Sequence, residues 1–120
     1  MCQNMATADK METTAGSWAL LGCKVPKDAH IVHLLRKAGA IVLGKSNLDE
    51  WAGMRAHKYA CGWSARGGQC RNPYVLSRSP QGSSGGSAVA VSANLVPISL
   101  GTETDCSVIS PAMVNGIVGM

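Results

Sequence analysis

An α/β fold is the class that this sequence predicts, because helical patterns alternate with short apolar runs along the chain. The first pattern has Asp28 as its N-cap and ends at Gly39, with apolar residues at i, i+3, i+4 and i+7. These apolar residues are Ile31, Leu34, Leu35 and Ala38. The uncharged run 40–43 then lies between glycines, as expected for a buried strand of a parallel-type sheet.

The second alternation lies in the C-terminal part of the chain. Small apolar residues over 85–93 predict a buried helix. Residues 96–100 predict a strand, in which Pro97 restricts pairing because it has no N–H to donate. A turn at Gly101 and a further helix after Ser107 complete the predicted order.

The middle of the chain has weaker patterns. Asn47, with Glu50 three residues later, predicts the cap of a short helix. Residues 53–81 predict a long loop, which could line the approach to the serines that follow it. His30 and His33 lie three apart on the first helix, but no third ligand is spaced to join them. We therefore expect a partly exposed structural pair there.

The stretch Pro80–Ser87 is rich in glycine and serine. Glycine lets backbone N–H groups approach a ligand closely, so such a loop before a helix can expose hydroxyls and amides together. A flexible linker is the simpler interpretation, but linkers are not normally followed by an apolar segment such as 88–93. A phosphate-binding loop of the Walker type needs a closing Gly-Lys-Ser/Thr, and no Lys or Arg follows Arg78.

Ser84 is the centre of a Gly-x-Ser-x-Gly match, the pattern of an α/β-hydrolase nucleophile. That fold places its acid and then its histidine after the serine. In this chain the three histidines, His30, His33 and His57, all precede Ser84. A Ser–His–Asp triad is therefore not expected, and the pattern indicates a base other than histidine.

Several motifs, in a fixed order, resemble those of the amidase signature family. They are Ala38–Glu50, Arg71–Tyr74, Gly82–Val91, Leu100–Val108, Pro111 and Asn115–Gly119. The resemblance covers nearly the whole chain, and the closest likeness is to amidases related to the A-type chain of the amidotransferases. It implies an α/β/α fold with a mixed sheet flanked by helices, of which residues 1–120 would be a partial, central fragment.

The resemblance also implies a mechanism, a Ser–cis-Ser–Lys triad that cleaves the C–N bond of a small-molecule amide. Ser107 falls on the nucleophile, and Ser83, in a cis peptide, on the serine that relays its proton. The oxyanion hole would come from backbone N–H groups of the turn Thr104, Asp105 and Cys106. The family mechanism needs no metal and no cofactor, so none is expected here.

Two departures from the family pattern bear on activity. Asn4 and Thr13–Ser17 match the family, but Cys2 stands where the catalytic Lys is expected. Loss of a general base typically costs about 10²–10⁴ in rate, and a thiol is a poor substitute because it is mostly neutral at pH 7. In addition, Asp105-Cys106 replaces a common Gly-Gly. The sequence thus predicts an impaired amidase, and the alternative is a catalytically inactive fragment or pseudoenzyme with at most a binding role.

Composition narrows the class of protein. The 120 residues carry a net charge of +4, but the cations are scattered, so direct nucleic-acid binding is not expected. The odd count of five cysteines, with no Cys-x-x-Cys, favours free thiols over disulfides or a zinc site. No apolar stretch has the length of a signal peptide core or a membrane span. We expect a cytoplasmic protein, with a partner chain if it is amidotransferase-like.

Overall fold

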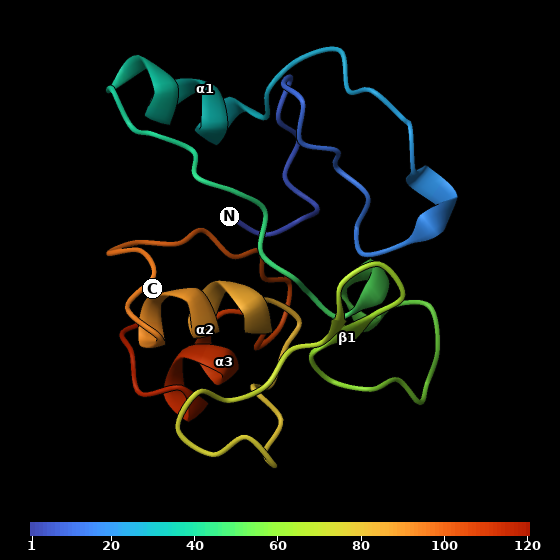
Figure 1. Cartoon of the computed structure of the whole chain (residues 1–120), viewed down its shortest axis with the longest axis vertical. Coiled ribbons are helices and arrows are strands. Elements are labelled where there is room, and N and C mark those ends of the chain that lie inside the picture. The colour runs from blue at the N-terminus through green and yellow to red at the C-terminus, as the bar shows by residue number, and fades with distance from the viewer.

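The computed structural model describes residues 1–120 and contains three α-helices and one two-stranded sheet, joined by long irregular segments (Figure 1). In chain order the elements are η1 (Trp18–Leu20), α1 (His30–Lys37), η2 (Glu50–Gly53), β1 (Trp63–Ser64), β2 (Gly68–Gln69), α2 (Gly85–Ser92) and α3 (Ile109–Val114). Helices α2 and α3 pack against each other, and α1 lies at the opposite end of the molecule (Figure 1). The α/β content is therefore confirmed.

Helix α1 forms where the apolar spacing predicts it, but its predicted cap is wrong. The helix begins at His30, and its N-cap is Ala29, which provides no side-chain hydrogen bond. The Asp28 carboxylate instead accepts the Ala8 N–H at 2.6 Å and pairs with Arg36 at 3.0 Å. The Asp28 carboxylate therefore binds the Arg36 guanidinium and the Ala8 N–H, and it does not bind the N–H groups of the first turn of α1.

The predicted strands 40–43 and 96–100 are wrong, because neither segment pairs as a strand along its length. Ile41 is 83% exposed and Ile98 is 79% exposed. Their neighbour in space is the short N-terminal segment, which contributes one isolated parallel bridge between Cys2 and Ser46. A strand exists only where a neighbouring backbone pairs with it. The expected mixed sheet flanked by helices is thus reduced to the antiparallel pair β1–β2.

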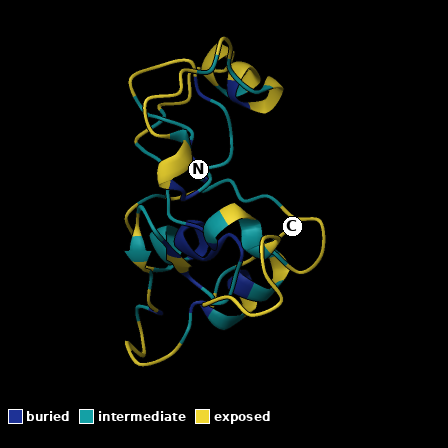
Figure 2. Cartoon of the chain, turned by 90° about the vertical axis from the view of Figure 1, so that its right-hand side faces the viewer, coloured by how far each residue is buried: buried dark blue, intermediate teal, exposed yellow.

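The interior is small and largely polar. Its buried apolar residues are Cys2, Val32, Leu48, Ala88 and Ala112. The buried polar residues are more numerous: Thr7, Thr14, Ser17, Asp49, Ser64, Asn72, Ser83, Ser84, Ser87 and Asn115. Figure 2 shows the buried stretches gathered around α2 and α3, whereas α1 is mostly exposed. Hydrogen bonding of these polar groups therefore holds the part of the chain that contains the serines.

Helix α2 begins at Gly85, as predicted, and its first turn is buried against the segment that precedes η2. A Cβ on Gly86 would overlap the backbone oxygen of Asn47, so only glycine allows this approach. The predicted cap at Asn47 is wrong: its side chain donates to Gly62 and Gly68 carbonyls. Asn47 therefore fastens the β1–β2 hairpin beside α2.

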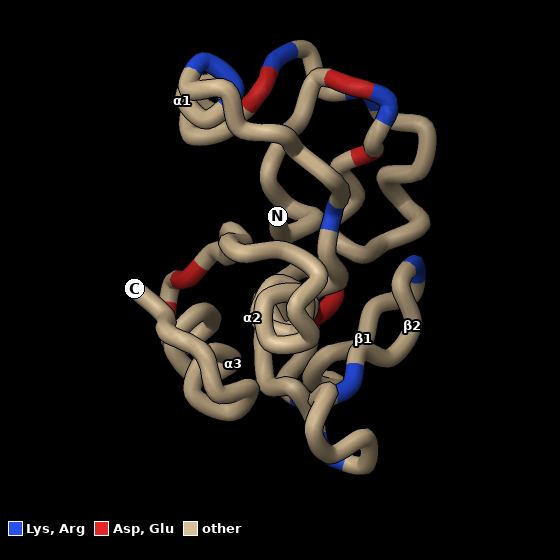
Figure 3. Tube along the Cα trace, turned by 60° about the vertical axis from the view of Figure 1, so that its left-hand side comes forward, with Lys and Arg blue, Asp and Glu red and all other residues tan.

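Charged side chains are unevenly distributed. Figure 3 shows Lys and Arg interspersed with Asp and Glu around α1 and the N-terminal segments, whereas few charges lie around α2 and α3. Four ion pairs occur: Arg36–Asp9, Arg36–Asp28, Arg55–Glu50 and Arg66–Glu12. None of the helices is long and apolar enough to cross a membrane.

Candidate active site

Ser83 lies in a buried turn between Pro80 and α2. The peptide bond between Gly82 and Ser83 is cis, which is the geometry that the family resemblance implies. The side chain is buried, with 3% of the residue exposed, and its hydroxyl has no hydrogen-bond partner. The Ser83 carbonyl accepts the Asp49 N–H at 3.0 Å. Ser83 is thus fixed by its backbone, and its hydroxyl is left free to act on another group.

Contacts from distant parts of the chain hold this turn. A Cβ on Gly82 would overlap a carboxylate oxygen of Asp49, so this position needs glycine. Burial raises the pKa of the Asp49 carboxyl, and the Gly62 N–H that it accepts at 2.5 Å partly opposes that rise. On the other side, the Asn115 amide donates to the Pro80 carbonyl at 2.8 Å.

Ser84 joins the two serine segments. Its N–H donates to the Ser107 carbonyl at 3.1 Å. Its hydroxyl donates to the Thr102 carbonyl at 3.1 Å and accepts the Thr102 N–H at 3.0 Å. The side chain that the Gly-x-Ser-x-Gly pattern singles out therefore links the two segments structurally, and it brings Ser83 and Ser107 to the same place.

The turn before Ser107 is open to solvent. Thr104, Asp105 and Cys106 are exposed, Ser107 is half-buried, and its hydroxyl lies 3.3 Å from the Asp105 carbonyl. Cys106 has a φ of 59°, in the left-handed region that favours glycine, which is the residue common there in the family. The N–H groups of Thr104 and Asp105 donate to no group in the chain, whereas that of Cys106 contributes to lowering the pKa of the Glu103 carboxyl. The oxyanion role of this turn stays a prediction.

Glu103 organises the start of α3. Its carboxylate accepts the N–H groups of Val108 at 2.5 Å and Ile109 at 2.9 Å. These bonds, first that of Ile109 and then that of Val108, hold the pKa of Glu103 below its ordinary value. The carboxylate is thereby directed at the N-terminus of α3. This contact fixes the backbone that directly follows Ser107.

Cys2, at the position of the expected Lys, lies beside this cluster. It is fully buried, and its N–H donates to the Leu100 carbonyl at 2.9 Å. Its thiol faces the hydroxyls of Ser84 and Thr102, and burial raises the pKa of the thiol. The side chain is therefore neutral at pH 7 and is not a proton acceptor of useful strength.

Lys45 is bound to the N-terminal segment. Its ammonium donates to the Met5 carbonyl and, at 2.8 Å, to the Thr13 hydroxyl. Burial lowers the pKa of Lys45. Since both partners belong to the N-terminal segment, the ammonium is committed there and not to the serines.

Three residues that the sequence does not single out complete the site: Asp49, Asn115 and Glu103. Asp49 and Asn115 lie within the motifs Ala38–Glu50 and Asn115–Gly119, but their partners are backbone groups distant in the sequence, so the motifs do not reveal what these two side chains do. Glu103 lies five residues before Val108, whose N–H it accepts, and that proximity to a predicted helix start is a usable signal.

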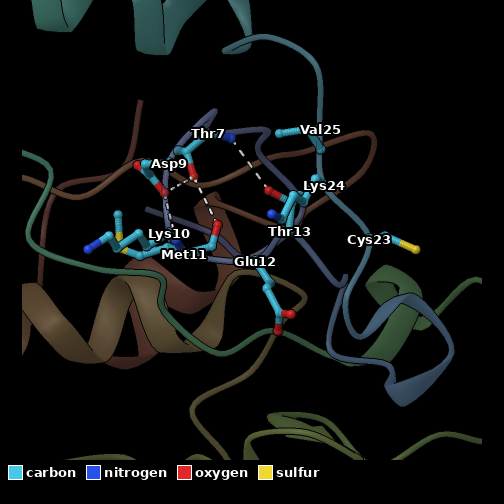
Figure 4. Close-up of a pocket in the computed structure, with 9 residues that line it drawn as sticks. All are labelled: Thr7, Asp9, Lys10, Met11, Glu12, Thr13, Cys23, Lys24 and Val25. Carbon is cyan, nitrogen blue, oxygen red and sulfur yellow. Dashed lines mark hydrogen bonds between the residues drawn. The ribbon is translucent and has the colours of Figure 1, made fainter.

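A hollow on the surface lies elsewhere. It encloses about 330 Å³ and is lined by Thr7, Asp9, Lys10, Met11, Glu12, Thr13, Cys23, Lys24 and Val25 (Figure 4). Hydrogen bonds among Thr7, Asp9 and Met11 brace its wall. It contains none of the predicted site residues. No group of three or more His, Cys, Asp or Glu side chains is placed to hold a metal ion.

Comparison with known proteins identifies relatives along almost the whole chain. The family model described as Amidase matches residues 3–120. A putative amidase of Schizosaccharomyces pombe is 57% identical over 117 residues, which are 98% of this chain and 20% of that protein. The A-type chain of the glutamyl-tRNA(Gln) amidotransferase of Aromatoleum aromaticum is 46% identical over 108 residues, 90% of this chain and 21% of that protein.

The fold has solved relatives as well. The structure of native peptide amidase from Stenotrophomonas maltophilia superimposes with a TM-score of 0.94 and 58% sequence identity, covering 98% of this chain and 24% of that one. The chain therefore spans between about a fifth and a quarter of the length of the relatives that it matches.

Proposed function

Because the chain belongs to the amidase family, we propose that its two serine turns form the nucleophilic part of a site that hydrolyses carboxamides. In this proposal Ser107 attacks the amide carbonyl, and its proton passes through Ser83 towards a base. The amine then leaves, and water hydrolyses the acyl-enzyme. Backbone N–H groups of Thr104, Asp105 and Cys106 would stabilise the oxyanion.

The unpartnered hydroxyl of Ser83 is the observation that carries this proposal. A buried hydroxyl without a partner costs about 1–3 kcal/mol, so a purely structural serine would be expected to form a hydrogen bond. Ser83 forms none, although Ser84 beside it forms two. A hydroxyl held ready to exchange protons with Ser107 and with a base accounts for this difference.

Cys2 determines how far the chain performs this reaction. The general base of the family is a Lys at this position, and a neutral thiol beside Ser84 supplies no equivalent. We therefore propose an amidase site with an intact nucleophile and an absent base. Cys2 also favours the second candidate, an inactive fragment or pseudoenzyme with a binding role. The two candidates differ in whether Ser83 and Ser107 can still react.

The domain context is part of the proposal. The chain spans 20–24% of its relatives, and large apolar side chains such as Ile41 and Ile98 are exposed. These facts support the proposal that residues 1–120 are a central fragment of a longer amidase domain, whose other parts would select the amide. The free thiols support a cytoplasmic location. The likeness to one chain of an amidotransferase supports a partner chain.

The test is covalent labelling by a fluorophosphonate, read by intact mass. The chain and its Cys2→Lys variant are compared, with Cys2→Met as the control of similar length that lacks a base. The proposal expects one added label in Cys2→Lys, at least 10²-fold faster than in Cys2→Met. Ser107→Ala in the Cys2→Lys background must abolish the label.

Other outcomes separate the alternatives. Ser107-dependent labelling of the unaltered chain would show that another group serves as base, and would rule out an inactive fragment. If Cys2→Lys stays unlabelled while its circular dichroism matches that of the unaltered chain, the nucleophile proposal fails.

A further inference from the structure

Asn115 and Gly116 end helix α3 beside the turn 80–83, here called the Ser83 turn. Asn115 is the C-cap of α3 and is fully buried, whereas Gly116 is exposed and has a φ of 68°. The Ile117 N–H donates to the Ala112 carbonyl at 3.0 Å, which closes the helix end in the way that is typical of a left-handed glycine. The pair Asn-Gly occurs only here in the chain.

An Asn-Gly pair carries its own reaction. Because glycine has no Cβ, its backbone nitrogen can approach the preceding side chain closely. The Gly116 nitrogen attacks Cγ of Asn115, and the proton of the N–H passes to water. The bond between Cγ and Nδ2 then breaks, ammonia leaves, and a five-membered imide remains. Water opens this ring at either of its two carbonyls, which leaves aspartate or isoaspartate at position 115.

The folded backbone keeps the reacting atoms apart. Ring closure requires Cβ of Asn115 and the nitrogen of Gly116 to be nearly eclipsed about the Cα–C bond. In the structure ψ of Asn115 is 9°, so the Gly116 nitrogen is instead nearly eclipsed with the backbone nitrogen of Asn115. The Gly116 N–H also donates to the Met113 carbonyl at 3.4 Å. The end of α3 must therefore unwind before the imide can form.

The Asn115 side chain is held as well. Its amide nitrogen donates to the carbonyls of Pro80 and Pro111, each at 2.8 Å. Its oxygen is buried and has no partner, so no donor would stabilise the negative charge that attack on Cγ places there. The Ser92 hydroxyl, on α2, donates to the Asn115 carbonyl at 2.7 Å. Contacts with α2 and with the Ser83 turn therefore oppose the reaction.

We propose that Asn115 is a deamidation site that the Ser83 turn protects, and that its conversion to a carboxylate releases this turn irreversibly. The reaction consumes one water and releases one ammonia. A carboxylate has no proton to donate, so the product cannot restore the hydrogen bond to the Pro80 carbonyl. This modification does not depend on the proposed hydrolysis of carboxamides.

Other asparagines of the chain provide internal comparisons. Asn94 is exposed, but the side chain of Leu95 hinders approach of the next nitrogen. Asn72 precedes Pro73, which has no N–H and so cannot form the imide by the same route. If exposure alone decided the site of reaction, Asn94 would react before Asn115.

The first test measures deamidation of the unaltered chain in mildly alkaline buffer, with and without guanidinium chloride. Peptide mapping by mass spectrometry detects aspartate and isoaspartate at each position. In denaturant Asn115 should react before Asn94. In native buffer Asn115 should react at least about tenfold more slowly than in denaturant, because it must wait for local opening.

Matched serine variants test which contacts protect Asn115. Ser92→Ala removes the hydrogen bond to the Asn115 carbonyl, so deamidation in native buffer should be at least about threefold faster than in the unaltered chain. Ser77→Ala, at an exposed serine, is the control and should leave the rate unchanged. In denaturant all three chains should react at the same rate.

The consequence is measured on the deamidated chain, which ion exchange separates by its added negative charge. The Asp49 N–H donates to the Ser83 carbonyl, so its hydrogen exchange reports on the Ser83 turn. This exchange should be at least about fivefold faster after deamidation. The His33 N–H, in α1 at the opposite end of the molecule, should exchange at an unchanged rate.

Four results would overturn the proposal. Asn115 could fail to deamidate in denaturant, or it could react as fast in native buffer as in denaturant. Ser92→Ala and Ser77→Ala could have the same rate in native buffer. The deamidated chain could also retain the slow exchange of the Asp49 N–H, in which case the modification would leave the Ser83 turn closed.

Discussion

The turns that carry Ser83 and Ser107 are adjacent in space but are held in different ways. The Ser83 turn is buried, and it is held by Asp49 and Asn115, which are distant in the sequence. The Ser107 turn is exposed, and its main contact is the local carboxylate of Glu103. The structure of the first turn therefore depends on the fold, whereas that of the second depends on its own few residues.

The two turns also differ in their expected response to pH. Burial raises the pKa of Asp49, so its contribution to stability is full at low pH and is lost as pH rises through the pKa of the folded state. Hydrogen bonds lower the pKa of Glu103, so its contribution is present above the ordinary value and is lost as pH falls through the pKa of the folded state. Substitutions in either turn test this contrast.

The largest effect is expected from Gly82→Ala. Its new Cβ would overlap a carboxylate oxygen of buried Asp49, and the clash should lower the free energy of unfolding by about 3 kcal/mol. Gly44→Ala is the control, because nothing lies within 4 Å of its Cβ, and it should change stability by less than about 1 kcal/mol. Urea denaturation measures both. Equal effects would mean that the Ser83 turn is not tightly held.

Asn115→Ala should follow, with a loss of about 2–3 kcal/mol in the free energy of unfolding. The side-chain amide donates to Pro80 and to Pro111, each at 2.8 Å, and so connects the Ser83 turn to α3. The isosteric control Asn115→Asp places a carboxylate against the same carbonyls. It should be at least as destabilised at pH 7 and should recover part of its stability in acid, where the carboxyl can donate. A variant insensitive to pH would contradict these bonds.

A smaller difference is expected between the neighbouring serines. Ser84→Ala removes two hydrogen bonds to Thr102 and should lower the free energy of unfolding by about 1–2 kcal/mol. Ser83→Ala removes a hydroxyl that has no partner and should change it by less than about 0.5 kcal/mol. Thermal and urea unfolding of the two variants provide the measurement. A larger loss from Ser83→Ala would assign that hydroxyl a structural bond.

The smallest effect concerns Glu103 and is local. The amide chemical shifts of Val108 and Ile109 should titrate with this carboxyl, with a midpoint below its ordinary value of 4.5. Glu103→Gln should abolish that titration and leave the Asp49 amide shift unchanged. The Ser83 and Ser107 turns would have to be coupled through this carboxylate if the Asp49 amide responded as well.

The same division between local and distant contacts explains what the sequence predicts. Helix α2 forms where its small residues and glycines predict it. Its glycines permit close packing, and this property can be read from the sequence before the neighbouring segment is known. Helix α3 follows Ser107, as predicted. The predicted strands 40–43 and 96–100 do not pair, because a strand requires a neighbour that composition does not reveal.

The candidate site divides in the same way. The order of the motifs predicts Ser83, Ser107 and Cys2 as site positions. In the structure, the hydrogen bonds from Ser84 to Ser107 and from Cys2 to Leu100 bring their segments together. The contacts of Asp49 and Asn115 cannot be predicted from the motifs that contain these residues, because each contacts backbone groups far along the chain. The ion pair of Asp28 with Arg36 likewise displaces a helix cap that local pattern favours.

The burial of Cys2 has a use in measuring motion. Cys23 and Cys106 are exposed and Cys61 and Cys70 are half-buried, whereas Cys2 is buried between Ser46 and Leu100. In the folded chain an alkylating reagent should modify Cys2 last, and only when the N-terminus separates from residues 44–46 and 100. The fifth alkyl group detected by mass spectrometry would therefore mark the reaction of Cys2. The rate at which it appears would measure how often the site opens, and no probe would have to be attached to the site.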